Sequence, residues 1–433
     1  MNSNNLSKKP KEAIPEVKCP FNTIKLLSEG YLFIPNRVRK YNSPVFLTRL
    51  MGKKVVCMSG KKPAEVFYDQ NLFTRKGAVP KRIQQTLFGK NAIQTLDGAA
   101  HIHRKLMFMS ILAPKQLKRL IAITQKQWQM SSKSWEKRNQ LVLFDEVSML
   151  LFQSACKWAG VPLNKKEARL KSRDMSAMID ALGAVGPRHW RGRLARNRSE
   201  RWTRTIISDV RSGRLKVPKN TALYTIAWHK NLDNRLMSTA TAAVELINIL
   251  RPITAIATYI VFGALALHTY PVYWNKYRTG DDAYHTMFVQ EVRRFYPFGP
   301  FLGARARIDF TWYKHNFKKG DLVFLSIFGT NHDKGIWNDP ESFRPERFAG
   351  CDLSPYDFIP QGGGDYKLGT RCPGEMLTIE LMKLSLDYLV TKLSYKVPLQ
   401  DLSYSLKRMP TLPKSKLIIT NVKGVSKNSD YQI

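Results

Sequence analysis

The chain has 433 residues and carries 70 Lys and Arg against 33 Asp and Glu, a formal net charge of +37. A chain of this length is long enough for two or three average domains, but no Gly/Ser-rich or Pro-rich linker divides it. Its five cysteines are odd in number and show no paired spacing, so neither a disulfide framework nor a zinc site is indicated. The charge attracts nucleic acid and anionic lipid non-specifically, which leaves a basic nucleic-acid or membrane-surface binding protein open.

In chain order, residues 1–18 are polar and lysine-bearing and lack the apolar core of a secretory signal, so we expect a disordered lead. Residues 44–58 alternate like a two-stranded hairpin around Met51 and Gly52. Helical patterns dominate from 113 to 393, and 395–422 is typical of short strands and turns. The prediction is a mainly α fold with small β-sheets, with a single domain over 19–422 and a flexible tail over 423–433.

A long apolar helix is expected to begin near Ser238 and to contain Arg251 and Pro252. An arginine among leucines and isoleucines is costly to bury without an anionic partner. It stays protonated at any relevant pH and binds a carboxylate through two hydrogen bonds. The proline removes one helix hydrogen bond and is expected to distort the helix there. The alternative interpretation is that Arg251 ends an amphipathic helix or pairs with Glu245.

Residues 252–275 contain no Asp, Glu, Lys or Arg and are nominally long enough to span a bilayer. Polar Thr254, Thr258 and His268, together with Pro271 and a basic stretch that follows, indicate instead the buried end of the central helix and the start of the next one. We therefore predict no transmembrane segment.

A helix is predicted over 284–296, ending at Pro297. Glu291 and Arg294 are three residues apart on it and within ion-pair reach. Residues 337–348, rich in proline, arginine and aromatic side chains, fit an ordered coil, and the arginines of this coil are expected to complete a buried network with Glu291.

Cys372 lies in the glycine-dense loop 358–375, which leads into an apolar helix expected over 376–393. A helix N-terminus and a flexible glycine backbone supply N–H donors around the sulfur, as a thiolate that binds heme iron requires. The alternative for the loop taken alone is a buried structural cysteine.

The order of these three segments resembles the cytochrome P-450 superfamily of heme-thiolate enzymes over nearly the whole chain. The resemblance implies one large P-450-type heme-thiolate fold, with 19–422 as its catalytic domain, heme b as cofactor and Cys372 as the ligand of the iron. Oxygen-activating members usually carry an acid and an alcohol where Arg251 and Pro252 stand. That replacement resembles the fatty-acid peroxygenase branch, in which hydrogen peroxide is the oxidant.

The same resemblance implies the remaining site residues. Arg75, His101, Lys105 and Arg371 would hold the heme, and Phe88, Ile179, Phe298 and Ala255 would line the acyl tunnel beside Arg251. Asp365 and Leu368 stand where most superfamily members carry phenylalanine and glycine, as expected of the longer peroxygenase loop. Thr370 replaces the histidine expected in that loop, which puts one propionate contact in question.

By resemblance, the catalytic residues are Arg251, Pro252 and Gln94. Branch members that form alkenes tend to carry histidine in place of Gln94, whereas hydroxylating members more often carry glutamine. The expected reaction is therefore hydroxylation of a long-chain fatty acid at the alpha or beta carbon by hydrogen peroxide, with decarboxylation to a terminal alkene as a side reaction. No obligatory reductase and no specific nucleic acid are expected as partners, and the expected location is the cytoplasm.

Two alternative functions follow from the same residues. A fatty-acid monooxygenase fed by a reductase is the nearer one, and the missing acid-alcohol pair argues against it. A basic nucleic-acid or membrane-surface binding protein is the second. Its densest cluster of positive charge comprises Arg188, Arg191, Arg193, Arg196, Arg198 and Arg201, interleaved with Trp190 and Trp202, and no helix-turn-helix, zinc-knuckle or RNA-recognition signature accompanies it.

Overall fold

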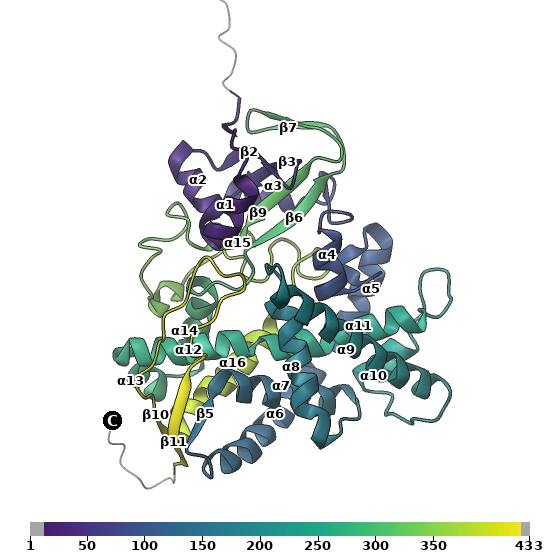
Figure 1. Ribbon diagram of the computed structural model, residues 1–433, viewed down its shortest axis with the longest axis vertical. Coiled ribbons are helices and arrows are strands. Elements are labelled where there is room, and N and C mark those ends of the chain that lie inside the picture. Colours follow the sequence, from purple (N-terminus) through teal and green to yellow (C-terminus); the bar gives the residue numbers. More distant parts are fainter. Residues whose placement is uncertain (1–12, 426–433) are drawn as a thin grey trace, which may run out of the picture.

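The computed structural model describes residues 13–425 (Figure 1). Most of the predicted lead, residues 1–12, and of the predicted tail, residues 426–433, lies outside the described residues. The predicted end of the lead at residue 18 and the predicted start of the tail at residue 423 were both wrong. Strand β1 (Glu16–Val17) pairs with β2 inside the predicted lead, and β11 (Ile418–Gly424) extends into the predicted tail. Both segments are held by backbone hydrogen bonds to neighbouring strands. A polar composition does not reveal such pairing, because backbone groups form the bonds.

The fold is mainly helical, as predicted. Its helices are α1 (Asn22–Glu29), α2 (Phe33–Tyr41), α3 (Lys61–Tyr68), α4 (Lys81–Ile83), α5 (Gly98–Ile111), α6 (Pro114–Trp135), α7 (Leu143–Ala159), α8 (Lys165–Asp180), α9 (Pro187–Arg211), α10 (Ala222–Ala227), α11 (Thr239–Ala255), α12 (Ala257–Thr269), α13 (Pro271–Thr279), α14 (Asp282–Phe295), α15 (Ile327–Asn331) and α16 (Glu375–Thr391). Short 3-10 or π turns are η1 (Gly30–Leu32), η2 (Gln84–Phe88), η3 (Ile93–Thr95) and η4 (Pro345–Phe348).

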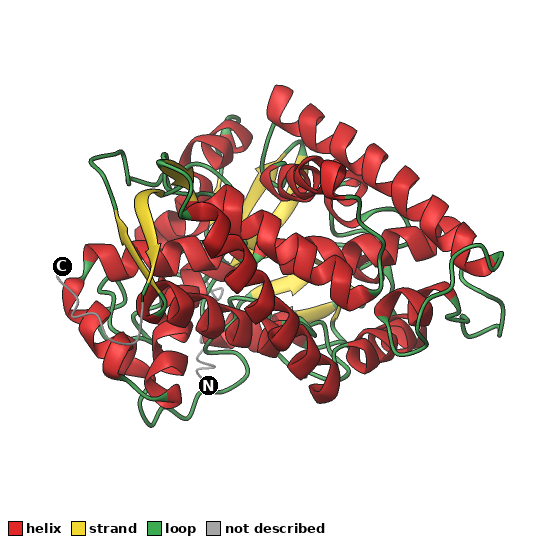
Figure 2. Ribbon diagram, turned by 90° about the horizontal axis from the view of Figure 1, so that it is seen from below, coloured by secondary structure: helices red, strands yellow, loops and turns green. Residues whose placement is uncertain are grey.

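The strands form small sheets. The largest has the order β1-β2-β3-β9-β6-β4, and β10-β11-β5 and the pair β7-β8 form the others. Their bounds are β2 (Val45–Leu50), β3 (Lys53–Met58), β4 (Phe73–Thr74), β5 (Gln140–Val142), β6 (Phe301–Ala306), β7 (Phe310–Trp312), β8 (His315–Phe317), β9 (Leu322–Ser326) and β10 (Leu393–Lys396). Figure 1 shows the largest sheet with α1 to α3 at one end of the molecule and the long helices at the other, and Figure 2 shows how far helices outweigh strands.

The predicted hairpin is confirmed. Strands β2 and β3 pair antiparallel from Val45 opposite Met58 to Leu50 opposite Lys53. The turn between them places Met51 and Gly52 at φ 49° and 75°, a left-handed conformation that glycine adopts without steric cost. In contrast, strands β6 to β9 lie within the stretch over which helical patterns were expected to dominate, so that expectation was wrong for 301–326. β6 and β9 are short, mostly apolar strands of the largest sheet, and a short apolar run does not distinguish a strand from a buried helix.

The central helices α11 and α12 are the core of the helical part. By length and composition 239–269 passes as a membrane span, yet 89% of its most apolar window is buried inside the fold, as in the core helix of a soluble domain. Pro252 lies inside α11 without ending it. The helix is interrupted four residues later, where the Ile256 N–H bonds to the Ile253 carbonyl at 3.3 Å. The expected distortion is thus displaced by one turn from the proline.

The predicted network around Glu291 is confirmed. Both Glu291 and Arg294 are fully buried, and Arg294 donates to the Glu291 carboxylate at 2.7 and 2.8 Å. Arg347 donates to the same carboxylate at 3.1 Å, as does the Arg344 backbone N–H at 2.7 Å. The segment that supplies them is not coil throughout, since Pro345–Phe348 forms a 3-10 turn that begins with the proline. Two donors of the coil therefore bind the Glu291 carboxylate of α14, and Arg294 of α14 in turn donates to the coil carbonyls of Pro340 and Ser342.

The arginine cluster between 188 and 201 lies on α9, but its charges do not form one exposed surface. Arg196 is fully buried and pairs with Glu200 at 2.7 Å. Arg191 pairs with Asp180 at 3.1 Å, and Arg198 donates to Asp174 at 3.0 Å. Arg191, Arg196 and Arg198 are thus paired within the fold, while Arg201 is exposed.

Candidate active site

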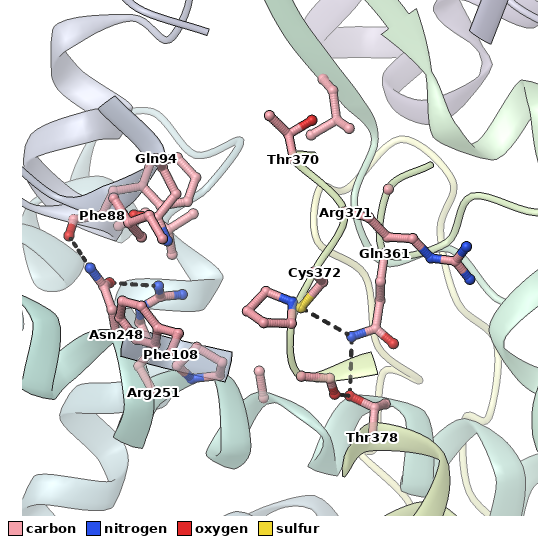
Figure 3. A pocket seen from close by; sticks show the side chains of 18 of the residues that line it. Phe88, Gln94, Phe108, Asn248, Arg251, Gln361, Thr370, Arg371, Cys372 and Thr378 are labelled. Carbon is pink, nitrogen blue, oxygen red and sulfur yellow. Dashed lines mark hydrogen bonds between the residues drawn. The ribbon is translucent and has the colours of Figure 1, made fainter. Parts of the chain in front are cut away.

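A cavity of about 420 Å³ lies between α11 and the loop that precedes α16 (Figure 3). The residues predicted for the site come from segments that are far apart in sequence. Nevertheless, all of them line this one cavity: Arg75, Phe88, Gln94, His101, Lys105, Ile179, Arg251, Pro252, Ala255, Phe298, Arg371 and Cys372. In Figure 3, Phe88, Gln94 and Arg251 lie on one side of the cavity and Cys372 on the other.

Cys372 presents its sulfur to the cavity at the start of the turn into α16. The Gln361 side-chain amide points at this sulfur from 3.7 Å and also donates to Thr378 of α16 at 3.1 Å. The Cys372 N–H donates to the Gln361 backbone carbonyl at 3.1 Å, so the two residues are tied together twice. Burial raises the pKa of the Cys372 thiol, and the Gly374 backbone N–H acts in the opposite direction. A cation at the sulfur would favour the thiolate in this setting.

A buried ion pair supports the base of this loop. Arg293 of α14 donates to the Glu375 carboxylate at 2.6 Å and to the Gln361 side-chain oxygen at 3.0 Å. Arg371 donates to the other oxygen of Glu375 at 2.6 Å. Arg371 lines the cavity, but its guanidinium is thus directed toward Glu375. Its expected role toward a heme therefore requires that this ion pair open or be shared.

Arg251 is the charged group on the opposite side of the cavity. Its side chain is buried, its Nη2 donates to the Asn248 side-chain oxygen at 3.1 Å, and its Nε has no hydrogen-bond partner. No carboxylate of residues 13–425 pairs with it. Burial, and secondly the neighbouring cation Arg196, lower the pKa of Arg251 to about 9. A buried cation in this state gains free energy from an anionic ligand.

Glu245 does not supply that anion, so the alternative interpretation of Arg251 is wrong. The Glu245 carboxylate is fully buried and pairs with Arg104 of α5 at 2.7 Å. It also accepts the Ile93 N–H at 2.9 Å and the Asn248 side-chain amide at 3.0 Å. Arg251 does not end the helix either, because α11 continues to Ala255.

Three basic side chains, those of Arg75, His101 and Lys105, line the cavity. Arg75 stacks over Phe67 at 3.9 Å, and its buried Nη1 has no partner. Lys105 donates to the carbonyls of Gly369 and Arg371, the second at 2.9 Å, and burial lowers its pKa to about 8. Burial, and secondly Lys105, also lower the pKa of His101, one turn earlier on α5. The three side chains bring hydrogen-bond donors to one part of the cavity, and Arg75 and Lys105 also bring positive charge.

The neutral residues fill the space around Arg251. Gln94 of η3 has a buried side-chain oxygen without a hydrogen-bond partner. Phe88 ends η2, and its backbone carbonyl accepts from Asn248 at 3.2 Å. Ile179, Ala255 and Phe298 add apolar wall from α8, α11 and the segment after α14. Thr370 also lines the cavity.

Sequence reasoning missed Asn248 and Gln361. Asn248 is a polar residue three positions before Arg251 on an otherwise apolar helix, and that spacing places both on one face. Gln361 stands in the cysteine loop eleven positions before Cys372. No local pattern links it to the sulfur, because the loop must fold back to bring them together.

Comparison with known proteins shows which family shares this fold and site. The profile of the family described as Cytochrome P-450 matches residues 283–421. The structure of cytochrome P450EX alpha with myristic acid is 41% identical, with a TM-score of 0.93, and the match covers 96% of this chain and 100% of that one. An OleT variant in complex with arachidonic acid is 36% identical, with a TM-score of 0.93 and coverage of 96% and 100%. The chain belongs to the cytochrome P-450 family.

Within the family, this P-450 groups with P450EX alpha, OleT and cytochrome P450SP alpha, so the expected peroxygenase branch is confirmed. The complex of P450SP alpha with (R)-ibuprophen is 43% identical, with a TM-score of 0.91 and coverage of 94% of this chain and 99% of that one. Curated relatives match less of the P-450. A nicotine N-demethylase of Nicotiana tomentosiformis is 30% identical over 27% of this chain and only 23% of its own length. The protopanaxadiol 6-hydroxylase of Panax ginseng is 23% identical over 84% and 81%.

Membership implies heme iron held by a cysteine thiolate. The cavity of this P-450 fits such a group. Cys372 presents a sulfur with a side-chain donor beside it, and Arg75 offers a buried N–H without a partner. Arg75, His101 and Lys105 also supply the donors that two heme carboxylates require. The site residues are therefore compatible with the cofactor of the family.

Proposed function

We propose that this P-450 is a heme-thiolate peroxygenase that uses hydrogen peroxide to hydroxylate long-chain fatty acids at the alpha or beta carbon. Arg251 carries the proposal. It is a buried cation that faces the cavity opposite Cys372, and no carboxylate within 13–425 neutralises it. A fatty-acid carboxylate supplies the missing charge, and the apolar wall accepts the acyl chain.

Heme b is the proposed cofactor, with Cys372 as the ligand of its iron. Arg75, His101, Lys105 and Arg371 are assigned to its carboxylates. Arg371 shares its guanidinium between Glu375 and the cofactor in this assignment. When bound, the heme iron supplies the centre at which peroxide is cleaved and the substrate oxidised.

The protein's own residues position the acid and limit where protons go. Arg251 holds the substrate carboxylate through its free N–H groups, which brings the carbons next to the carboxylate closest to the cofactor. Arg251 does not exchange protons at neutral pH, so the substrate carboxylate is the group that moves a proton between the two peroxide oxygens. In the overall reaction, one C–H bond and one hydrogen peroxide are consumed, and one C–OH bond and one water are formed.

Gln94 and Pro252 have secondary roles in this proposal. The Gln94 amide can donate a hydrogen bond but does not titrate, which favours hydroxylation over decarboxylation. Pro252 leaves the Asn248 backbone carbonyl without its helix N–H, next to Arg251. Phe88, Ile179, Phe298 and Ala255 line the path of the acyl chain.

No obligatory reductase and no specific nucleic acid are needed for this chemistry, and we assign the enzyme to the cytoplasm. A reductase is not needed because peroxide supplies both the oxygen atom and the oxidising equivalents. A specific nucleic-acid partner is not indicated, since Arg191, Arg196 and Arg198 form ion pairs within the fold.

The test is to mix purified, heme-loaded enzyme with hexadecanoic acid and hydrogen peroxide, without any reductase, and to identify products by mass spectrometry. Hydroxy acids are expected, and Arg251→Ala should abolish their formation while the heme remains bound. Arg201→Ala, an exposed cation on α9, is the matched control and should retain activity. Product formed only with a reductase and a nicotinamide cofactor would establish the monooxygenase alternative instead.

A further inference from the structure

The tip of the β2–β3 hairpin and the start of α1 together expose large apolar side chains. Phe21, Ile24 and Met51 are 62%, 61% and 60% exposed. The Met51 backbone N–H donates to the Thr23 hydroxyl at 2.7 Å, which fixes the hairpin turn to α1. Three apolar side chains are therefore left largely in water at the end of the molecule where Figure 1 shows the largest sheet.

The hairpin turn is an unfavourable place for a methionine. Met51 has a φ of 49° and Gly52 a φ of 75°, the left-handed conformation that a two-residue hairpin turn of this kind requires at both positions. Asparagine, aspartate or glycine is usual at the first position, because the left-handed conformation brings the Cβ of most other residues too close to the backbone. Folding alone thus does not explain an exposed methionine at the tip.

The same surface carries positive charge that the fold does not neutralise. Arg49 and Lys54 lie directly opposite each other on β2 and β3, and both are exposed. Like charges in such a cross-strand pair destabilise a hairpin. Glu29, four residues after Lys25 on α1, is paired with Arg37 at 2.8 Å. Within 13–425, no carboxylate forms an ion pair with Lys25, Arg49, Lys53 or Lys54.

An anionic lipid surface complements both the apolar side chains and the cations. A bilayer accepts exposed apolar side chains at the depth of its headgroups, and its phosphates attract nearby lysine and arginine. Nucleic acid would neutralise the cations but leave the apolar side chains in water. Residues 1–12 carry three lysines and one glutamate, and a second copy of this surface is equally basic, so neither complements the charge.

We infer that this surface docks the enzyme on an anionic lipid bilayer. The α1–hairpin surface comprises Phe21, Ile24, Lys25, Arg49, Met51, Lys53 and Lys54. Its apolar side chains enter the headgroup region, and its cations bind lipid phosphates. Docking needs neither heme nor peroxide, so the inference stands apart from the proposed function. Where that function holds, docking brings the enzyme to its substrate, because long-chain acids partition into bilayers.

The experiment measures cosedimentation of the heme-loaded full chain with vesicles, in physiological salt and without substrate or peroxide. The vesicles contain phosphatidylcholine alone, or phosphatidylcholine and phosphatidylglycerol in equal parts. The affinity for the anionic vesicles should be at least about tenfold higher. A chain with a net charge of +37 is attracted to anionic vesicles over its whole surface as well, so the decision comes from matched variants.

Met51→Asn tests the apolar contact without changing the charge. It should weaken binding to the anionic vesicles at least about fivefold, because an apolar side chain no longer leaves water. Asparagine suits this turn, so the variant should unfold at a temperature no lower than that of the wild type, which excludes misfolding as the cause. Met130→Asn, at a position of α6 that is 64% exposed, is the control and should bind like the wild type.

Arg49→Gln combined with Lys54→Gln tests the charge. This double variant should lose at least about fivefold more affinity than Lys126→Gln combined with Lys133→Gln, which removes the same charge from exposed positions of α6. Hydrogen exchange measured with anionic vesicles locates the contact. Residues 21–27 and 49–54 should exchange more slowly than in the free protein.

Equal affinities of the hairpin variants and their α6 controls would show that net charge alone attracts the protein, and would overturn the inference. Tighter binding to a double-stranded DNA fragment than to the vesicles, unchanged in Met51→Asn, would also overturn it and indicate a nucleic-acid partner. None of these measurements depends on turnover. A failure of docking therefore leaves the peroxygenase proposal intact, and inactivity with peroxide leaves the docking surface intact.

Discussion

Asn248 accepts a hydrogen bond of 3.1 Å from the Arg251 guanidinium, one turn further along α11. The Asn248 amide nitrogen donates to Glu245 at 3.0 Å and to the Phe88 carbonyl at 3.2 Å, so its oxygen must face Arg251. Glu245 is in turn held by Arg104. Arg251 is therefore oriented by a buried chain of hydrogen bonds that ends on another helix, which leaves its remaining N–H groups free for a substrate.

Replacing Asn248 tests this orientation. Asn248→Leu should weaken fatty-acid binding about tenfold, because a hydrogen bond to a charged group contributes about 1.5 kcal/mol or more. Asn248→Asp should weaken it further, since the new carboxylate competes for Arg251. Dissociation constants from spectral titration of the heme-loaded enzyme measure both. Exposed Asn197→Leu on α9 serves as control, and an Asn248→Leu enzyme of normal affinity would contradict the role.

Gln361 is expected to tune the thiolate. Its amide lies 3.7 Å from the Cys372 sulfur, and a donor there stabilises negative charge on the ligand. Gln361→Leu should lower the reduction potential of the heme by roughly 40 mV, equivalent to about 1 kcal/mol for a one-electron couple. Spectroelectrochemical titration measures the potential, with exposed Gln125→Leu as control. A potential equal to that of the wild type would show that the amide does not act on the sulfur.

The buried network of Glu291 should matter for stability rather than chemistry. Glu291→Gln leaves Arg294 and Arg347 as buried cations without their carboxylate, and the expected loss is about 3–5 kcal/mol of unfolding free energy. Urea denaturation provides the comparison. Glu167→Gln removes a partly exposed pair with Lys171 at 3.6 Å and should cost less than about 1 kcal/mol. Equal losses in the two variants would argue against a special role for the network.

His332 should make the fold sensitive to acid. Burial, and secondly Arg294, lower the pKa of His332 to about 3, well below the value near 6.5 in an unfolded chain. The unfolded state therefore binds a proton between about pH 6.5 and 3 that the folded state does not, and stability falls as pH decreases through that window. From pH 7 to 5 this group contributes a loss of about 2 kcal/mol. Urea denaturation at the two pH values should show a smaller loss in His332→Gln, whereas exposed His268→Gln should behave like the wild type.

The residue at position 94 should affect the product ratio. Gln94→His introduces a side chain that donates and accepts protons near neutral pH, and the alkene fraction should increase several-fold at the expense of hydroxy acids. Gln94→Asn keeps the neutral amide and should keep hydroxylation dominant. Products from peroxide-driven turnover can be separated by gas chromatography and mass spectrometry. Alkenes as the main product of the wild type would refute the interpretation of Gln94.

Much of the site could be predicted because it depends on short segments with strong local constraints. The spacing of Glu291 and Arg294 on one helix predicts their contact, and the glycine-dense loop before an apolar helix predicts N–H donors around the Cys372 sulfur. The family resemblance then selected residues between 75 and 372 that do line one cavity. Boundaries were less predictable, since β1 and β11 are stabilised by partner strands far away in sequence.

By itself, the sequence determined the helical class, the hairpin, the cysteine loop and the presence of one arginine inside an apolar helix, since each of these depends on composition or spacing within a few turns. Only the tertiary structure decided which partner each buried charge has. Arg104, from a helix that lies 141 residues away in sequence, rather than Arg251, neutralises Glu245, and Arg371 turns to Glu375. The physical reason is that a buried charge takes the partner that packing brings within 3 Å, and packing between distant segments leaves no local pattern.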